Sequence, residues 1–280
     1  MTLGGLVLAL VAAISVRQQR LHADLTDRLA LAEQLRQAAT VLPIELRGLA
    51  IDAGDLREAR DTAVEFRSTI ASAIVCDTAG GGVILASASP GSSALAGFLT
   101  SITEGDTAWV LTPGDSVDRW NPFPIATATT IAGGPCDRAG PVLDASARAI
   151  GRISLRFASA QPVTAGAVIR VTRPTRYSLY RGGDGRWCLG AREWNAAANR
   201  FNTIQPVSGP FASAAARGLE LQYFDSVGGA LPQPVVNLRD VALIRVIVRG
   251  QTHRSMRAFS AAHGKASDSA IVALALRNRR

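Results

Sequence analysis

Residues 1–50 read MTLGGLVLALVAAISVRQQRLHADLTDRLALAEQLRQAATVLPIELRGLA, and this stretch decides the fold. It carries no charge from Leu3 to Val16 and then becomes mostly polar. In the polar part, apolar residues recur at steps of three or four, which places one stripe along a helix. The members of this stripe are Leu21, Leu25, Leu29, Ala32, Leu35, Ala39, Leu42, Leu46 and Leu49. We therefore predict one helix over residues 2–50, apolar all round in its first third and amphipathic beyond.

Pro43 lies inside this pattern. A proline removes one backbone hydrogen bond of a helix and clashes with the preceding turn. We therefore expect a kink or a restart between Thr40 and Pro43.

The uncharged segment is short for a membrane span. Its 14 residues cover about 21 Å as a helix, against a hydrocarbon layer of roughly 30 Å. A cleaved secretory signal is disfavoured as well, because no basic residues precede the segment and no clear small-x-small site follows it. Because the segment continues as one helix into the amphipathic half, neither a simple membrane span nor a cleaved signal accounts for it.

Strand-like patterns follow Gly54. We predict strands at 62–70, 83–85, 108–112, 150–158, 167–172, 176–180, 218–224, 241–249 and 270–277. The stretch 114–141 contains four prolines and is expected to form an irregular insertion. The predicted fold class is α+β, with a helix domain at 1–50 and a β-rich antiparallel head at 51–280.

The basic balance of the chain does not by itself favour nucleic acid as a partner. The formal charge is +8, yet Lys265 is the only lysine and the arginines are spread along the chain. The densest basic run contains Arg249, Arg254 and Arg257, which we name as a candidate anion-binding set. The competing interpretation is a solvated loop between the last two strands.

The cysteine pattern gives no metal site. Cys76, Cys136 and Cys188 show no CxxC spacing, and the chain has three histidines, so zinc has little support. Two interpretations stay open. One is a disulfide, with Cys76 and Cys136 as the candidate pair and one thiol left over; the other is three buried cysteines.

The chain lacks the short motifs that accompany common reactions. There is no HExxH, GxSxG, GxxxxGK[ST] or GxGxxG after a strand, and no pair of carboxylates stands out. The Arg181–Arg186 stretch is glycine-rich, and between two strands it is typical of a hairpin turn rather than a phosphate or calcium loop. We predict no catalytic residue, no metal, no cofactor and no enzymatic activity.

Several stretches resemble one family. Met1-Thr2-Leu3 with the apolar run 6–11 resembles the mature start of type IV prepilin-like proteins. Three further stretches are similar to strands of PilW-like minor pilins and of J-type pseudopilins of type II secretion: 175–181 (TRYSLYR), 217–225 (RGLELQYFD), and 241–249 taken with 270–278. The resemblance implies a pilin-like fold, in which the stripe from Leu21 to Leu49 lies on the chain's own β-rich head.

The resemblance also implies a function without catalysis. The chain would be a structural subunit of a type IV pilus or of a type II secretion pseudopilus. A prepilin peptidase would process it and N-methylate Met1, and Leu3, Gly5, Leu6 and Leu10 would mediate filament assembly with other pilins. Before assembly the subunit would sit in the bacterial inner membrane as a single-pass protein, with its head in the periplasm or outside the cell.

Gly5 departs from the family pattern. The family has a glutamate at this position, which is thought to pair with the N-terminal amine of the adjoining subunit. A subunit that lacks the carboxylate is expected near the tip of the filament.

A second class of function remains open beside this one. The chain would then be a membrane-anchored extracellular binding protein, an adhesin or a DNA-uptake receptor, that uses its helix only as an anchor.

Overall fold

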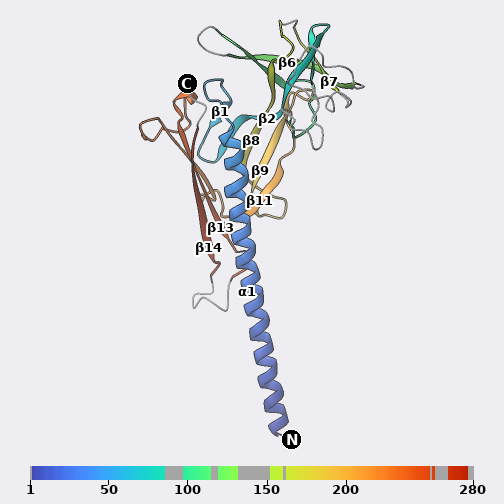
Figure 1. The fold of residues 1–280 in the computed structure, drawn as a ribbon. Coiled ribbons are helices and arrows are strands. Elements are labelled where there is room, and N and C mark those ends of the chain that lie inside the picture. The colour runs from blue at the N-terminus through green and yellow to red at the C-terminus, as the bar shows by residue number, and fades with distance from the viewer. Residues whose placement is uncertain are drawn as a thin grey trace. The chain divides into compact units, whose positions relative to one another are not determined.

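A computed structural model describes residues 2–85, 97–114, 119–131, 152–159, 162–252, 254–255 and 264–276 (Figure 1). The described part contains one long helix, α1 (Thr2–Arg47), and fourteen strands. The chain forms two compact units. The first unit holds residues 1–65, 176–192 and 204–280, and the second holds 66–175 and 193–203.

The strands have the following bounds: β1 Leu56–Ala59, β2 Ala63–Ala79, β3 Gly82–Leu85, β4 Gly97–Phe98, β5 Thr107–Thr112, β6 Arg119–Ile131, β7 Arg152–Phe157, β8 Val168–Arg181, β9 Trp187–Asn195, β10 Arg200–Phe201, β11 Gln205–Phe211, β12 Leu219–Phe224, β13 Leu243–Gln251 and β14 Ser267–Ala275. A short 3-10 helix, η3, covers Leu238–Asp240.

The helix α1 runs without interruption through Pro43, so the predicted restart is wrong. Pro43 lies one turn before the end of the helix at Arg47 and is itself buried. Leu42 and Leu46 flank it and are fully buried. Packing of this last turn outweighs the single hydrogen bond that proline removes, since burying one leucine contributes about 2 kcal/mol.

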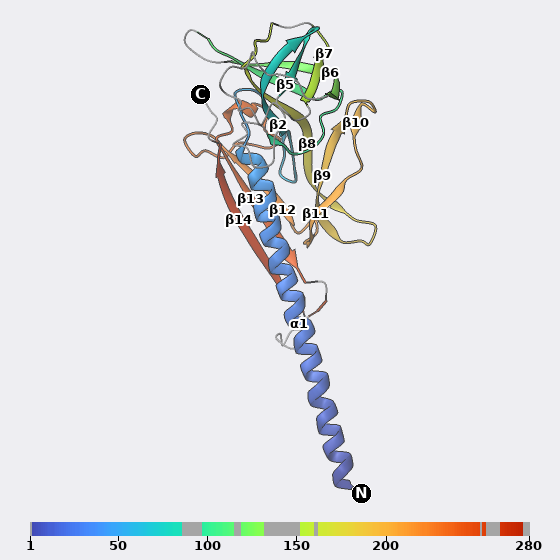
Figure 2. The same cartoon turned by 45° about the vertical axis from the view of Figure 1, so that its right-hand side comes forward.

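Only the second half of α1 packs on strands of the first unit. Its buried apolar residues are Leu31, Leu35, Ala38, Leu42 and Leu46, and they face β11, β13 and β14. Leu35, Leu42, Leu46 and Leu49 of the predicted stripe are buried, as expected. Leu21, Leu25 and Leu29 are exposed, so the prediction that they lie on the chain's own head is wrong. The reason is their direction around the axis: at 100° per residue, Leu21, Leu25 and Leu29 point on average about 100° away from the covered face. Asp24, which lies on the covered face, is 7% exposed. The two views of the helix are shown in Figures 1 and 2.

Gly250 of β13 lets the helix approach the sheet closely. A Cβ atom built on Gly250 would lie 2.3 Å from Leu31 Cδ1 and 3.4 Å from Leu35 Cδ2. A side chain at this position would force Leu31 to move, because real Cβ contacts are longer than 3.0 Å. Gln34 fixes the same contact with polar bonds: its Oε1 accepts from the Gly209 N–H at 2.9 Å, and its carbonyl accepts from the Ser208 hydroxyl at 2.7 Å.

The strands of the first unit form an antiparallel ladder in the order β8, β9, β11, β13, β12, with β14 also paired to β13. β13 pairs with β12 from Leu219 opposite Val248 to Phe224 opposite Leu243. The strand predictions at 218–224 and 241–249, and the part of 270–277 that the structure describes, are confirmed here. The predictions rested on the strand-like pattern of residues in the sequence, and in β12 this pattern appears as alternating burial.

The second unit has the strand order β3, β7, β6, β5, β8 around its own apolar core. β6 lies within the stretch 114–141 that we expected to be irregular, so that prediction is wrong for 119–131. Pro122 and Pro124 fit a strand because the β7 ladder begins only at Ile125. The Ile125 N–H points to β5, where it donates to the Asp106 carbonyl. The nitrogens of both prolines therefore face the side without a paired strand, which is where sheets tolerate proline.

A buried ion network ties three parts of the second unit together. Arg173 donates from Nε and Nη2 to the Asp106 carboxylate, at 2.8 Å each, and from Nη1 to Glu193 at 2.9 Å. The Arg173 side chain is 9% exposed and that of Asp106 is 4% exposed. The hydrogen bonds to Asp106 raise the pKa of Arg173 although burial opposes this. Arg173 therefore stays charged in its buried position.

The fold class predicted from the resemblance is wrong. The chain has one long helix and a large number of antiparallel strands, which is compatible with an α+β layout. It does not have a single pilin-like head after the helix. The strands divide between two compact units, and the chain passes from one unit to the other after residues 65, 175, 192 and 203. The long strands β2, β8 and β9 each contribute residues to both units, which local sequence patterns do not reveal.

Candidate assembly surface on the N-terminal helix

The first half of α1 exposes large apolar side chains to solvent. Nine of them are between 37% and 72% exposed: Val7, Leu8, Leu10, Val11, Ile14, Val16, Leu21, Leu25 and Leu29. Small apolar residues separate those before Val16, and no acidic residue stands in the first turn. Beyond Val16, polar and charged residues separate them, including Arg17, Arg20 and Arg28. An apolar surface of this extent on a folded protein marks an interaction site more often than a chance exposure.

Part of this surface forms a continuous stripe. Val7, Val11, Ile14, Leu21 and Leu25 are separated by 4, 3, 7 and 4 positions, the steps of a heptad repeat. At 100° per residue, this stripe points about 100° around the helix axis from the face that carries Leu31 to Leu49. The helix thus has two apolar faces, one covered by its own strands and one that has no partner among the described residues.

The predicted assembly residues fall at the start of this surface. Gly5 and Leu10 lie in α1 and are exposed. A Cβ atom at Gly5 would meet nothing within 4 Å, so the fold does not require glycine there. Leu3 and Leu6 belong to the helix, but their side chains lie outside the described part, as does Met1. Their roles in processing and assembly stay predictions.

The apolar segment does not reach the length of a membrane span. Among the described residues, no helix contains an apolar window long enough to cross a bilayer.

The candidate anion-binding set is only partly described. Arg249 pairs with Glu220 at 2.9 Å and donates to the Arg217 carbonyl at 2.8 Å. Burial alone would raise the pKa of Glu220, but hydrogen bonds from Gln222 and Arg249 outweigh it and lower the pKa. Because its guanidinium is already committed to a carboxylate, Arg249 is a poor choice for holding an external anion.

The other two members of that set give less information. Arg254 is exposed, and Arg257 lies outside the described residues. Anion binding by this set stays a prediction.

The cysteines are partly described as well. Cys76 is disulfide-bonded, and Cys188 is free. Cys136 lies outside the described residues, so its pairing with Cys76 stays a prediction. Burial raises the pKa of the Cys188 thiol, which keeps it protonated and weakly reactive near neutral pH.

The glycine-rich stretch Arg181–Arg186 is a hairpin turn between β8 and β9, as predicted. The Gly182 N–H donates to the Arg186 carbonyl at 2.8 Å, and the Asp184 carboxylate accepts from the Arg186 N–H at 3.0 Å. In the part of the chain that the structure describes, no three His, Cys, Asp or Glu side chains gather in a way that could hold a metal ion.

Comparison with known proteins gives no family assignment, since no family model, no curated protein and no solved structure matches the chain. The function therefore has to be argued from the residues and their geometry.

Proposed function

We propose that this chain is a non-enzymatic structural subunit of a thin helical filament, a minor pilin or pseudopilin. In this proposal α1 bundles with the helices of neighbouring subunits in the filament core. The observation that carries it is the exposed apolar half of α1, with nine large side chains between Val7 and Leu29. The proposal concerns assembly through the helix and does not depend on a pilin-like head.

The energetics favour several neighbours over one. The nine side chains are about half exposed, so burying each contributes about 1 kcal/mol, or roughly 9 kcal/mol together. Association of two proteins costs about 4–15 kcal/mol in lost freedom of motion. A single helix pair that covers one side of α1 therefore gains little, whereas a bundle that covers the helix all round gains the full amount. This supports a filament core rather than a dimer.

Processing and location belong to the same proposal. A prepilin peptidase acts on the N-terminus, and Met1 becomes the N-methylated first residue. Before assembly the subunit is held in the bacterial inner membrane by its N-terminal helix, with the strand-bearing part in the periplasm or outside the cell.

N-terminal mass spectrometry of the native protein tests the proposal. The chain recovered from sheared surface filaments is expected to begin with N-methylated Met1. An intact leader upstream of Met1, or a cut near Ala13, would contradict the processing that filament subunits require.

The absence of a carboxylate at position 5 supports a place near the filament tip. The test is Gly5→Glu, with Gly4→Glu as a matched control that adds the same charge one position away. Both glycines have nothing within 4 Å of an added Cβ, so neither change disturbs the fold. We expect Gly5→Glu to give no gain in incorporation along the shaft. If labelled Gly5→Glu protein spreads along the shaft at normal filament number, the tip position is wrong.

One observation favours the alternative function, a membrane-anchored extracellular binding protein. It is a pocket of about 270 Å³ in the first unit, whose lining includes Trp187, Phe211 and Lys265. A strain without prepilin peptidase separates the two functions. An anchored binding protein stays at the cell surface in that strain, whereas a filament subunit is lost from it.

A further inference from the structure

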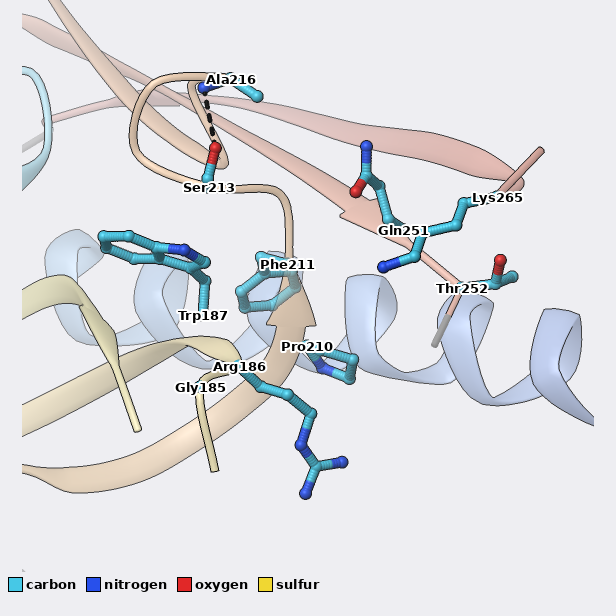
Figure 3. A pocket seen from close by; sticks show the side chains of 10 residues that line it. All are labelled: Gly185, Arg186, Trp187, Pro210, Phe211, Ser213, Ala216, Gln251, Thr252 and Lys265. Atoms are coloured by element: carbon cyan, nitrogen blue, oxygen red, sulfur yellow. Dashed lines mark hydrogen bonds between the residues drawn. The ribbon is translucent and has the colours of Figure 1, made fainter. Parts of the chain in front are cut away.

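A pocket of about 270 Å³ lies in the first unit, where the β8–β9 turn, the end of β11 and the ends of the β13–β14 pair come together (Figure 3). Its described lining is Gly185, Arg186, Trp187, Pro210, Phe211, Ser213, Ala216, Gln251, Thr252 and Lys265. The volume is close to the lower limit of small-molecule sites and suits a molecule the size of a monosaccharide.

One side of the pocket is aromatic. Trp187 of β9 and Phe211 of β11 are directly opposite each other in the antiparallel ladder. Phe211 is buried, and Trp187 is half-buried. Figure 3 shows the two rings next to each other, with the ring of Pro210 nearby. Trp187, the more exposed of the two, offers a flat apolar surface against which a ring of similar size can stack, and Phe211 packs beside it.

The opposite side carries a cation, Lys265, that pairs with no carboxylate of the described residues. The side chain of Lys265 reaches toward Phe211 in Figure 3, and Lys265 forms no ion pair with any described residue. Arg186 differs, because it pairs with Asp184 and turns away from the other lining residues. The described lining contains no carboxylate. Lys265 is exposed, so its ammonium group can reach an anion that enters the pocket from solvent.

Two polar side chains of the lining, Ser213 and Gln251, can add directional bonds. The hydroxyl of Ser213 accepts from the Ala216 N–H at 3.2 Å and keeps its own proton for donation. The amide of Gln251 can donate and accept. The Thr252 hydroxyl is already used, since it donates to the Arg254 carbonyl at 2.9 Å and accepts from the Ala266 N–H at 3.0 Å.

We infer that this pocket binds a small organic carboxylate that has a flat apolar face. Lys265 holds the carboxylate, Trp187 and Phe211 contact the flat face, and Ser213 and Gln251 bond to further polar groups. Two kinds of molecule share this chemistry, an acidic sugar and an aryl carboxylate. The inference is independent of filament assembly, because none of these residues belongs to α1.

Titration of the full-length chain in detergent micelles tests the inference. The signal is the tryptophan indole N–H in ¹H–¹⁵N spectra, and Trp187→Phe identifies the resonance of Trp187. The probes are glucuronate and benzoate, with glucose and benzyl alcohol as neutral counterparts. At about 0.3 kcal/mol per heavy atom, a 13-atom ligand such as glucuronate binds with a Kd on the order of 1 mM. We expect at least one carboxylate to shift the Trp187 signal at that concentration, and its neutral counterpart to leave it unchanged.

Two charge variants make the test specific. Lys265→Gln should weaken binding of the effective carboxylate about tenfold, because it removes a charge-assisted bond. Arg200→Gln, an exposed change in the second unit, should leave the Kd unaltered. Preference for glucuronate or for benzoate identifies the kind of ligand. The inference is overturned if neither carboxylate shifts the Trp187 signal at about 20 mM, if the neutral probes bind as tightly, or if Lys265→Gln binds as the parent chain does.

Discussion

Leu42 and Leu29 lie on the same helix in opposite environments, which permits a sharp comparison. Leu42 is 0% exposed, and Leu29 is 71% exposed. Leu42→Ala leaves a cavity between the helix and the strands, so it should lower the free energy of unfolding by about 2–5 kcal/mol. Leu29→Ala removes a side chain of which less than a third is covered, so the same quantity should fall by about 0.5 kcal/mol or less.

For filament assembly, we expect Leu29→Ala to have a marked effect although its effect on stability is small. If neighbouring helices cover the exposed part of Leu29, its loss costs about 1.5 kcal/mol of contact, which is roughly a tenfold weaker association. Urea unfolding followed by circular dichroism measures stability. The amount of chain in sheared filaments, relative to its amount in cells, measures assembly. Leu29→Ala should therefore be stable and poorly incorporated.

Two results would refute this reasoning. Equal destabilisation by both variants would mean that Leu29 is covered within its own chain. Normal incorporation of Leu29→Ala at wild-type cellular levels would mean that this part of the helix touches no neighbour in the filament.

Three further outcomes are expected. Arg173→Met should lower the unfolding free energy by about 3–5 kcal/mol in urea denaturation, because it leaves a buried carboxylate unpaired; a loss under about 1 kcal/mol would show that the network is not needed. The lowered pKa of Glu220 means that its contribution to stability is present above the unfolded-state pKa, about 4.3, and is lost as pH falls through the folded-state value. The stability difference between the parent chain and Glu220→Gln should thus shrink from pH 6 to pH 3 in denaturation series, and a constant difference would contradict the assignment. Non-reducing peptide mapping should join Cys76 to Cys136 and find Cys188 alkylated only after unfolding; a Cys76 peptide joined to Cys188 would disprove the pairing.

Sequence periodicity predicted the helix and the strands whose two faces differ in burial. Leu35 and Leu42 were placed correctly because apolar spacing reports a face that is covered. The same spacing placed Leu29 incorrectly. Steps of three and four let a stripe turn slowly around the helix axis, so Leu29 points about 140° away from Leu42. The spacing does not show which part of such a stripe is covered.

Other elements carried weak or misleading local signals. β6 was missed because proline usually excludes a strand. Proline is tolerated in β6 because the pairing with β7 begins only after Pro124, which the sequence does not show. β11 contains Gly209 and Pro210, and no alternating pattern marks it. The pocket was missed for the same reason, since Trp187 and Lys265 are far apart in sequence and only the pairing of β9 with β11 and of β13 with β14 brings them to one place. In the sequence, the only feature that pointed to the pocket was Lys265, the one lysine of the chain. Composition alone did not link this lysine to a binding site.

The close approach at Gly250 determines how much of the helix is available to other molecules. Leu31 packs over this glycine. Sliding the helix by one turn, about 5.4 Å, would bring Asp27 or Arg28 to the same place and bury a charged side chain among apolar ones, which is unfavourable. A shift in this direction, which would shorten the exposed part of the helix, is therefore disfavoured. Gly250, a residue in the last strand pair, thus helps to set how far α1 extends beyond its contact with the strands. That length is about 43 Å for the 29 helical residues ahead of Leu31. Substituting Gly250 would force Leu31 to move and so loosen this contact without touching any residue of the exposed surface.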